Sequence, residues 1–240
     1  MANLFNQWGN FLFHTRNVLF PVIIAMVLFL WPPLAIDNIP GVYLMIIGLL
    51  MVLVGQGLRI LTIGLVYIVR GGQRRRIYAK KLVTDGLFSH CRNPLYVGNI
   101  LIVNGFLFIS GNITGMIIGS LVFLTIYRLI VYSEESFLSA TFGEAYTAYC
   151  ANVPRWIPRP AGLKETINNY RFDWPAVAVK EYGTIFTSLM ISLGLIAWKL
   201  YLVDKLVEYQ LSLTGFAILV VAAYGIVRYL KKTDRLRSMR

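Results

Sequence analysis

Six long apolar runs, separated by short polar segments, decide what this chain can fold into. They lie, in chain order, at residues 18–36, 41–69, 97–110, 113–131, 183–203 and 212–227. A helix needs about 20 apolar residues to cross the hydrocarbon core of a bilayer, and most of these runs are about that long. The third run is shorter, and only Gly111-Asn112 separates it from the fourth. This spacing predicts a tight helical hairpin.

The runs predict transmembrane helices rather than the strands of a transmembrane barrel, because barrel strands alternate apolar and polar residues. The chain is 57% hydrophobic and 14% charged, with a mean hydropathy of +0.64, as in integral membrane proteins. We therefore expect an all-α polytopic transmembrane bundle of about six spans. The first run starts after Arg16 and lacks a small-residue cleavage pattern, so we expect it to be retained rather than removed as a signal peptide.

The basic residues predict the orientation in the membrane. A cytoplasmic N-terminus gathers 19 of the 23 Lys and Arg on the cytoplasmic side, as the positive-inside rule requires. Both termini are then cytoplasmic, in the inner or plasma membrane of a prokaryote. This rule and anionic headgroups account for the net charge of +12, so we expect no nucleic-acid partner. Cys91 and Cys150 fall in cytoplasmic segments, where thiols stay reduced, so we expect no disulfide.

Two polar segments contain the residues that can carry chemistry. Residues 70–96 form a basic connection, and residues 132–182 begin with an adjacent pair of glutamates. Apolar and aromatic residues at helical spacing after Ser133 predict an amphipathic helix along the membrane surface. The three prolines of VPRWIPRP then predict an extended stretch that lines or covers the mouth of a pocket.

The motifs in these segments resemble a known superfamily. GQGLR, LVTDGLFSHCRNPLYVG and EESFLSATFGEAYTAYCANVPRWIP occur in this order, with an apolar hairpin before the last. Together they resemble the isoprenylcysteine carboxyl methyltransferase and phospholipid methyltransferase superfamily, whose signature is LV-x-x-G-x-Y-x-x-x-RHP-x-Y-x-G followed by EE-x-x-L-x-x-x-FG-x-x-Y-x-x-Y. The resemblance covers roughly residues 55–158. It implies a membrane methyltransferase core at residues 1–160, with residues 161–240 as an extension of two further spans.

The resemblance also implies S-adenosyl-L-methionine as the cofactor, in a pocket at the cytoplasmic face. The residues that it implies as cofactor-binding are Gln73, Lys80, Lys81, Leu82, Val83, Phe88, Asn93, Pro94, Leu95, Tyr96 and Glu134. The chemical groups of the cofactor add Arg92, Tyr146 and Tyr149 as candidates. The basic residues suit the cofactor's carboxylate, the glutamate suits its ribose and adenine, and the aromatic rings suit its base and sulfonium.

Two positions depart from the signature. The histidine of RHP is Asn93 here, and an amide cannot act as a cation or as a titrating base. The substrate-orienting arginine that prenylcysteine enzymes carry one turn before the glutamate pair is matched by Ile130. This argues against a prenylcysteine acceptor more than against methyl transfer. The candidate catalytic residues are Arg59, Arg128, Glu135 and Arg155.

Some of these residues also have purely structural interpretations. Arg59 lies in a span without acidic residues and must reach water or a partner, for which Glu134 or Glu135 is available. Arg128 lies near the end of a span, where it can snorkel to the interface. His90 is the only histidine placed to act as a base, and the alternative is a solvated loop residue. The two histidines and two cysteines do not indicate a metal site.

The expected function is methyl transfer to a lipophilic acceptor, either a carboxylate or a lipid headgroup. The cofactor enters from the cytoplasm and the acceptor from the bilayer, so membrane lipids and a lipophilic or lipidated acceptor are the expected partners. Two alternatives remain open. One is an NADPH-dependent sterol or steroid-type reductase, because such enzymes share an R-x-P-x-Y-x-G pattern. The other is a non-catalytic lipid-binding relative. The sequence does not indicate an oligomeric state.

Overall fold

The computed structural model describes residues 2–36, 39–66, 79 and 81–236, which form helices and turns without a strand. The elements are α1 (Ala2–Leu30), α2 (Ile39–Leu65), η1 (Gly86–Ser89), α3 (Pro94–Ser110), α4 (Ile113–Phe142), α5 (Glu144–Asn152), α6 (Leu163–Asn169), α7 (Trp174–Leu202) and α8 (Leu206–Lys232). Five of the helices are long and apolar enough to cross a membrane, and the apolar α3 is shorter. The expected all-α bundle of about six spans is confirmed.

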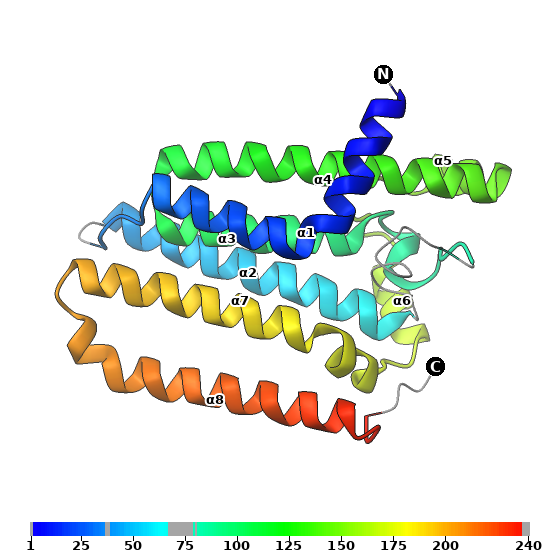
Figure 1. The fold of residues 1–240 in the computed structure, drawn as a ribbon. Coiled ribbons are helices and arrows are strands. Elements are labelled where there is room, and N and C mark those ends of the chain that lie inside the picture. The colour runs from blue at the N-terminus through cyan, green and yellow to red at the C-terminus, as the bar shows by residue number, and fades with distance from the viewer. Residues whose placement is uncertain (1, 37–38, 67–78, 80, 237–240) are drawn as a thin grey trace.

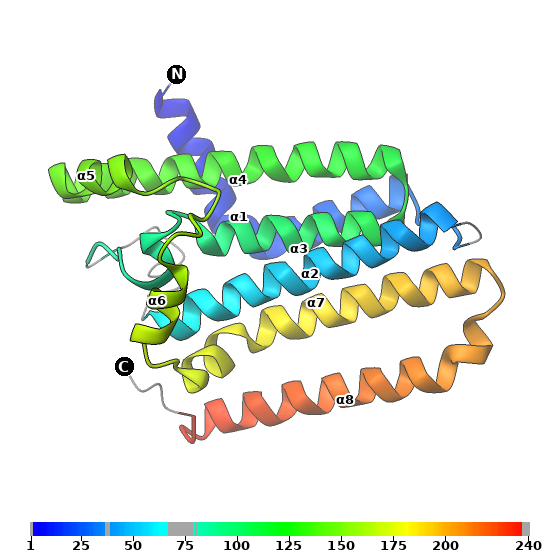
Figure 2. The same ribbon diagram turned by 180° about the vertical axis from the view of Figure 1, so that it is seen from behind.

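The long helices run up and down in one bundle, and consecutive ones are antiparallel (Figure 1). α2 packs closely against α3, α1 lies on α4, α7 lies on both α2 and α3, and α8 lies on α7. α1 begins and α8 ends at the end of the bundle that also carries η1, α5 and α6 (Figure 2). We call this the cap end and the opposite one the far end.

Glycines bring α2 and α3 into backbone contact. A Cβ atom on Gly55 would lie 2.6 Å from the Gly98 carbonyl oxygen, and one on Gly48 would lie 2.6 Å from the Gly105 carbonyl oxygen. Small residues at a helix interface let the backbones approach closely. This approach places Arg59, one turn after Gly55, directly over the start of α3.

A tight turn at the far end joins α3 to α4, as the sequence predicts. Gly111 ends α3 with a φ of 74°, a conformation that side chains rarely adopt. Asn112 caps α4 by accepting a hydrogen bond from Gly115 N at 3.2 Å. Lys199 on α7 reaches this turn and donates from Nζ to Ser110 O at 3.1 Å. The far end of α7 is therefore fixed to the hairpin.

Two helix boundaries differ from the sequence predictions. No separate surface helix begins at Ser133, because α4 continues to Phe142 and the chain bends only at Gly143, where φ is 52°. The short α5 then folds back beside the end of α4 (Figures 1 and 2).

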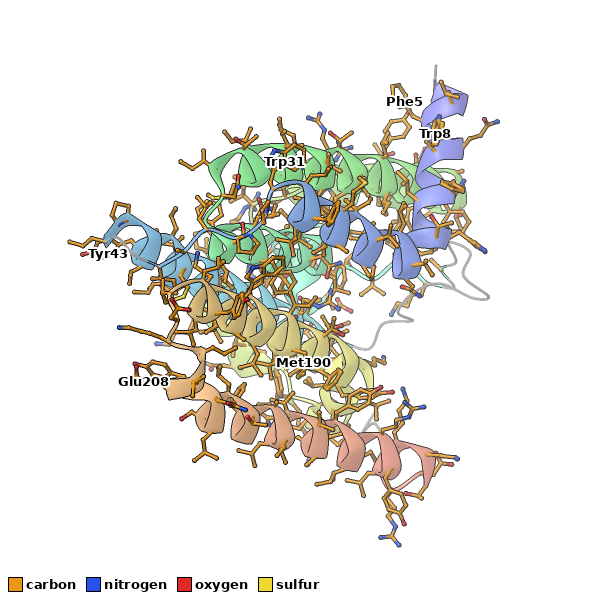
Figure 3. All side chains as sticks on the ribbon, turned by 60° about the vertical axis from the view of Figure 1, so that its left-hand side comes forward. Phe5, Trp8, Trp31, Tyr43, Met190 and Glu208 are labelled. Atoms are coloured by element: carbon orange, nitrogen blue, oxygen red, sulfur yellow. The ribbon has the colours of Figure 1, made fainter. Side chains whose placement is uncertain are left out.

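The first helix also starts earlier, at Ala2 instead of residue 18. Its first part projects from the bundle and carries the exposed side chains of Phe5 and Trp8 (Figure 3). Exposed aromatic residues of this kind are typical of membrane–water interfaces.

Candidate functional site

The polar turn before α3 is covered by the extended stretch that follows α5. Arg92 N donates to Pro154 O and Arg159 N donates to His90 O, and both hydrogen bonds are 2.9 Å long. These backbone hydrogen bonds hold the proline-containing stretch against residues 90–92. The two sequence blocks that carry the motifs therefore meet at the cap end.

His90 fastens α6 to this turn. Its Nδ1 lies 2.9 Å from Arg159 O, and its Nε2 lies 2.8 Å from the Thr166 hydroxyl. A carbonyl only accepts, so Nδ1 donates to Arg159 O, and Nε2 shares a hydrogen bond with the Thr166 hydroxyl. The His90 side chain is 5% exposed. The prediction of a solvated loop residue is therefore wrong, and both ring nitrogens are engaged by protein atoms.

Glu135 is the carboxylate at which the two blocks join. Asn93 Nδ2 donates to Glu135 Oε1 at 3.1 Å and also to Arg155 O at 3.1 Å. The Arg155 guanidinium pairs with Glu135 Oε2 at 2.5 Å. Glu135 is only 9% exposed, and this buried carboxylate is paired with an arginine of its own block and hydrogen-bonded to the block before it.

Arg92 brings a second cation to the same carboxylate. Its Nη1 lies 3.4 Å from Glu135 Oε1 and 2.9 Å from the Cys150 sulfur. Burial lowers the pKa of Arg92, but Glu135 and Cys150 outweigh this effect and the net pKa is raised. Its buried Nε has no hydrogen-bond partner among the residues that the structure describes. A buried guanidinium N–H at this position thus lacks a protein acceptor among the described residues.

Glu134 faces a different neighbourhood from Glu135. It lies against the Tyr96 hydroxyl and near the Arg16 guanidinium of α1. The Tyr96 ring lies 5.9 Å from the ring of Tyr127. Adjacent helical residues point about 100° apart, so the two glutamates face two neighbouring parts of the cap end.

Three aromatic candidates gather on the Glu135 side. The Tyr149 hydroxyl donates to Phe88 O at 2.7 Å, which ties α5 to η1. The Tyr146 and Tyr149 rings lie 6.1 Å apart. Burial raises the pKa of both tyrosines, and neighbouring Glu135 raises that of Tyr146 further. Both hydroxyls therefore stay protonated at neutral pH.

Arg59 pairs with a residue that the sequence did not suggest. Its guanidinium is 2% exposed and binds Glu181 on α7 through two hydrogen bonds of 2.9 Å. The expectation that a charge buried in a span must find a partner is confirmed. The expected partners, Glu134 and Glu135, are wrong.

The other candidates are dispersed. Arg128 is exposed on α4, Lys81 is exposed before η1, and Leu82 and Val83 are half-buried. Pro94 and Leu95 form the first turn of α3. Gln73 and Lys80 lie outside the described residues. No group of three or more His, Cys, Asp or Glu residues able to hold a metal ion occurs within the described ranges.

Sequence reasoning missed three residues near the candidate site: Arg16, Cys150 and Glu181. In the sequence, Arg16 is one of the basic residues that predict the orientation, and Cys150 is predicted to be a reduced thiol. Glu181 carried a usable signal, because it is an acidic residue at the edge of an apolar run, as Arg59 is a basic one within a run. Two isolated opposite charges beside apolar runs are candidates for a buried pair.

The groups at the cap end fit the chemistry of S-adenosylmethionine. The unpartnered Arg92 Nε suits a carboxylate, because charge-assisted hydrogen bonds of guanidinium groups to carboxylates are strong. Glu134 and Glu135 supply acceptors for hydroxyl or amine donors. Tyr146 and Tyr149 present rings that can stack on a base or a cation.

Comparisons with known proteins indicate similarity to methyltransferases. Residues 41–145 match the phospholipid methyltransferase family. The protein-S-isoprenylcysteine O-methyltransferase of Schizosaccharomyces pombe is 35% identical over 77 residues, which are 32% of this chain and 33% of that protein. No solved structure matches the chain.

Two further relatives carry names from metal resistance. The cobalt-zinc-cadmium resistance protein CzcN of Cupriavidus metallidurans is 33% identical over 32% of this chain and 36% of its own length. The nickel-cobalt-cadmium resistance protein NccN of Alcaligenes xylosoxydans xylosoxydans is 37% identical over 33% of this chain and 37% of its own. The chain thus spans about a third of the length of each curated relative that it matches.

Proposed function

Residues 41–145 of this chain belong to the isoprenylcysteine carboxyl methyltransferase and phospholipid methyltransferase superfamily, and on this premise we propose that the protein is a membrane methyltransferase. It uses S-adenosylmethionine as the methyl donor and methylates a lipophilic acceptor, either a carboxylate or a lipid headgroup. The cap end faces the cytoplasm, from which the cofactor enters, and the acceptor enters from the bilayer.

The observation that carries the proposal is the junction of the two motif blocks. Asn93 and Arg92 from the first block and Arg155 from the second all contact Glu135. This junction forms beside an Arg92 nitrogen that lacks a partner among the described residues. A buried N–H group without an acceptor costs free energy unless a ligand meets it. We assign the cofactor's carboxylate to this nitrogen.

The remaining candidate residues bind and orient the cofactor. Glu134 accepts from the ribose or adenine, and Tyr146 and Tyr149 cover the base and the sulfonium. When bound, S-adenosylmethionine supplies a methyl group on a sulfonium, and in-line displacement of a neutral thioether depends mainly on proximity and alignment. The extended stretch at residues 153–159 covers the turn before α3 and restricts the access of water.

Among the described residues at the junction, the acceptor side has one exposed cation. The Arg59 side chain is buried in its ion pair with Glu181, whereas the Arg155 side chain is 43% exposed beside Glu135. Arg155 is therefore the stronger candidate to orient an anionic acceptor group. A carboxylate acceptor needs no general base, which agrees with the full engagement of His90 by Arg159 and Thr166.

Calorimetric titration of the purified full chain tests the cofactor class. We expect S-adenosylhomocysteine to bind and NADPH not to bind. Arg92→Gln should weaken the binding of S-adenosylhomocysteine by about tenfold or more, because the substitution removes a charged hydrogen-bond donor. Arg228→Gln on α8 is the matched control, because Arg228 is an exposed arginine that contacts only Tyr224 on its own helix in the described structure. We expect Arg228→Gln to bind S-adenosylhomocysteine with the wild-type affinity.

Three outcomes contradict the proposal. Binding of NADPH without S-adenosylhomocysteine supports a reductase. Binding of neither supports a non-catalytic relative. An equal loss of affinity in Arg92→Gln and Arg228→Gln removes Arg92 from the site.

A further inference from the structure

A buried ion pair joins the C-terminal helices to the turn that carries the candidate cofactor residues. Arg59 on α2 and Glu181 on α7 are connected by two hydrogen bonds, Nε to Oε2 and Nη2 to Oε1, each 2.9 Å long. Gln56 Nε2 adds a weaker contact to Glu181 Oε2 at 3.4 Å. A planar guanidinium that is hydrogen-bonded through two of its nitrogens cannot rotate. Glu181 therefore fixes the direction of the third nitrogen.

That third nitrogen points at the start of α3. Arg59 Nη1 donates to Leu95 O at 3.4 Å and to Asn99 Oδ1. The stem of Arg59 passes over Gly98, where a Cβ atom would lie 2.6 Å from Arg59 Cγ. The first turn of α3, which continues from Asn93, rests directly on the Arg59 side chain.

The contacts continue from α3 to α4. Asn99 hydrogen-bonds the Tyr127 hydroxyl, and the Tyr127 ring lies 5.9 Å from the Tyr96 ring. Tyr96 in turn lies against Glu134. A chain of polar and ring contacts thus crosses the bundle from Glu181 to Glu134, and its second half consists of candidate cofactor residues and their immediate supports.

We propose, building on the methyltransferase function above, that Glu181 is a positioning residue for the cofactor site. By gripping Arg59 it holds residues 93–96 in the orientation that contacts the cofactor. Glu181 lies outside the family-matched residues 41–145. The extension at residues 161–240 therefore completes the site of the core. A pair that only tightened helix packing would change stability without changing ligand affinity.

The test uses the full chain in phosphatidylcholine nanodiscs and two measurements. Hydrogen–deuterium exchange of residues 93–99 without ligand reports the turn itself, and calorimetry reports the affinity for S-adenosylhomocysteine. Glu181→Gln should raise the exchange and weaken the affinity, each by about tenfold or more, because small misplacements at a site are costly. Lys199→Met is the matched control, because Lys199 is also a buried charge on α7 but contacts Leu34 O and Ser110 O at the far end. It should lower the melting temperature and leave both measurements unchanged.

The outcomes separate this inference from the proposed function. Wild-type exchange and affinity in Glu181→Gln overturn the inference, and so do equal changes in Lys199→Met. If Glu181→Gln does not fold, Arg59→Met/Glu181→Met removes both members of the ion pair and should show the same two changes, whereas wild-type values overturn the inference. If the wild type does not bind S-adenosylhomocysteine, the methyltransferase proposal fails, while the exchange comparison still decides whether Glu181 holds the turn.

Discussion

Asn93 and Glu135 are joined by a hydrogen bond of 3.1 Å, although 42 residues separate them in the chain. The Asn93 amide uses both of its donors, one for the Glu135 carboxylate and one for Arg155 O. It therefore joins the turn before α3, the end of α4 and the stretch after α5. An amide suits this role because it can donate twice without carrying a charge.

Replacing Asn93 should loosen this junction. Asn93→Leu removes one hydrogen-bond donor from Glu135 Oε1 and one from Arg155 O. We therefore expect the free energy of unfolding to fall by about 1–3 kcal/mol. Asn93→His, which restores the superfamily signature, retains a donor and should lose less. Denaturant titration of the ligand-free protein checks the order. Methyl transfer that appears only in Asn93→His would contradict the proposed function of the natural chain and favour a non-catalytic relative.

The close contact between α2 and α3 predicts opposite effects for two neighbouring glycines. A Cβ atom on Gly55 would meet Gly98 O at 2.6 Å and Leu101 Cβ at 2.9 Å, whereas one on Gly57 would have no atom within 4 Å. Gly55→Ala should therefore destabilise the protein by about 1–3 kcal/mol, because overpacking separates the helices. Gly57→Ala should be neutral or stabilising by up to about 1 kcal/mol, because alanine favours a helix. Unfolding in detergent compares them, and equal effects would contradict the close contact.

The sequence predicted the bundle because long apolar runs have few alternatives in a membrane. It also predicted that the blocks around Arg92 and Glu135 belong together, although this came from the resemblance rather than from spacing. The sequence did not predict the partner of Arg59. Arg59 and Glu181 are 122 residues apart, and several helix arrangements can supply a partner for one buried arginine. The break between α4 and α5 was also mispredicted, because the amphipathic pattern after Ser133 does not reveal that the helix stays unbroken until Gly143.

His90 should be a structural residue rather than a base. Its two ring nitrogens contact Arg159 O and the Thr166 hydroxyl, so His90→Ala removes these two side-chain contacts and leaves only the backbone hydrogen bond from Arg159 N to His90 O among those described above. We expect faster hydrogen–deuterium exchange over residues 159–169 and faster trypsin cleavage at Lys164, which is exposed on α6. His14→Ala is the control, because His14 is exposed on α1. Unchanged exchange over α6 in His90→Ala would contradict this role.

The buried thiol of Cys91 should make the protein less stable in alkaline solution. Cys91 is 0% exposed, and burial raises its pKa, although the Asn93 backbone N–H and Arg92 partly oppose the shift. In the unfolded chain the thiol ionises near pH 8.5, roughly the ordinary value for cysteine. Because the folded-state pKa is higher, the contribution to stability is complete below about pH 8.5 and is lost as the pH rises through the folded value.

For this one group the free energy of unfolding should fall by at most about 1.4 kcal/mol per pH unit above that point. Denaturant titrations between about pH 7.5 and 9.5 measure the slope, below the range in which free tyrosines ionise. Cys91→Ala should flatten it, whereas Cys150→Ala should not, because Cys150 is only half-buried. Maleimide should label Cys150 before Cys91 in the folded protein. A slope that survives in Cys91→Ala would place the alkaline sensitivity in another group.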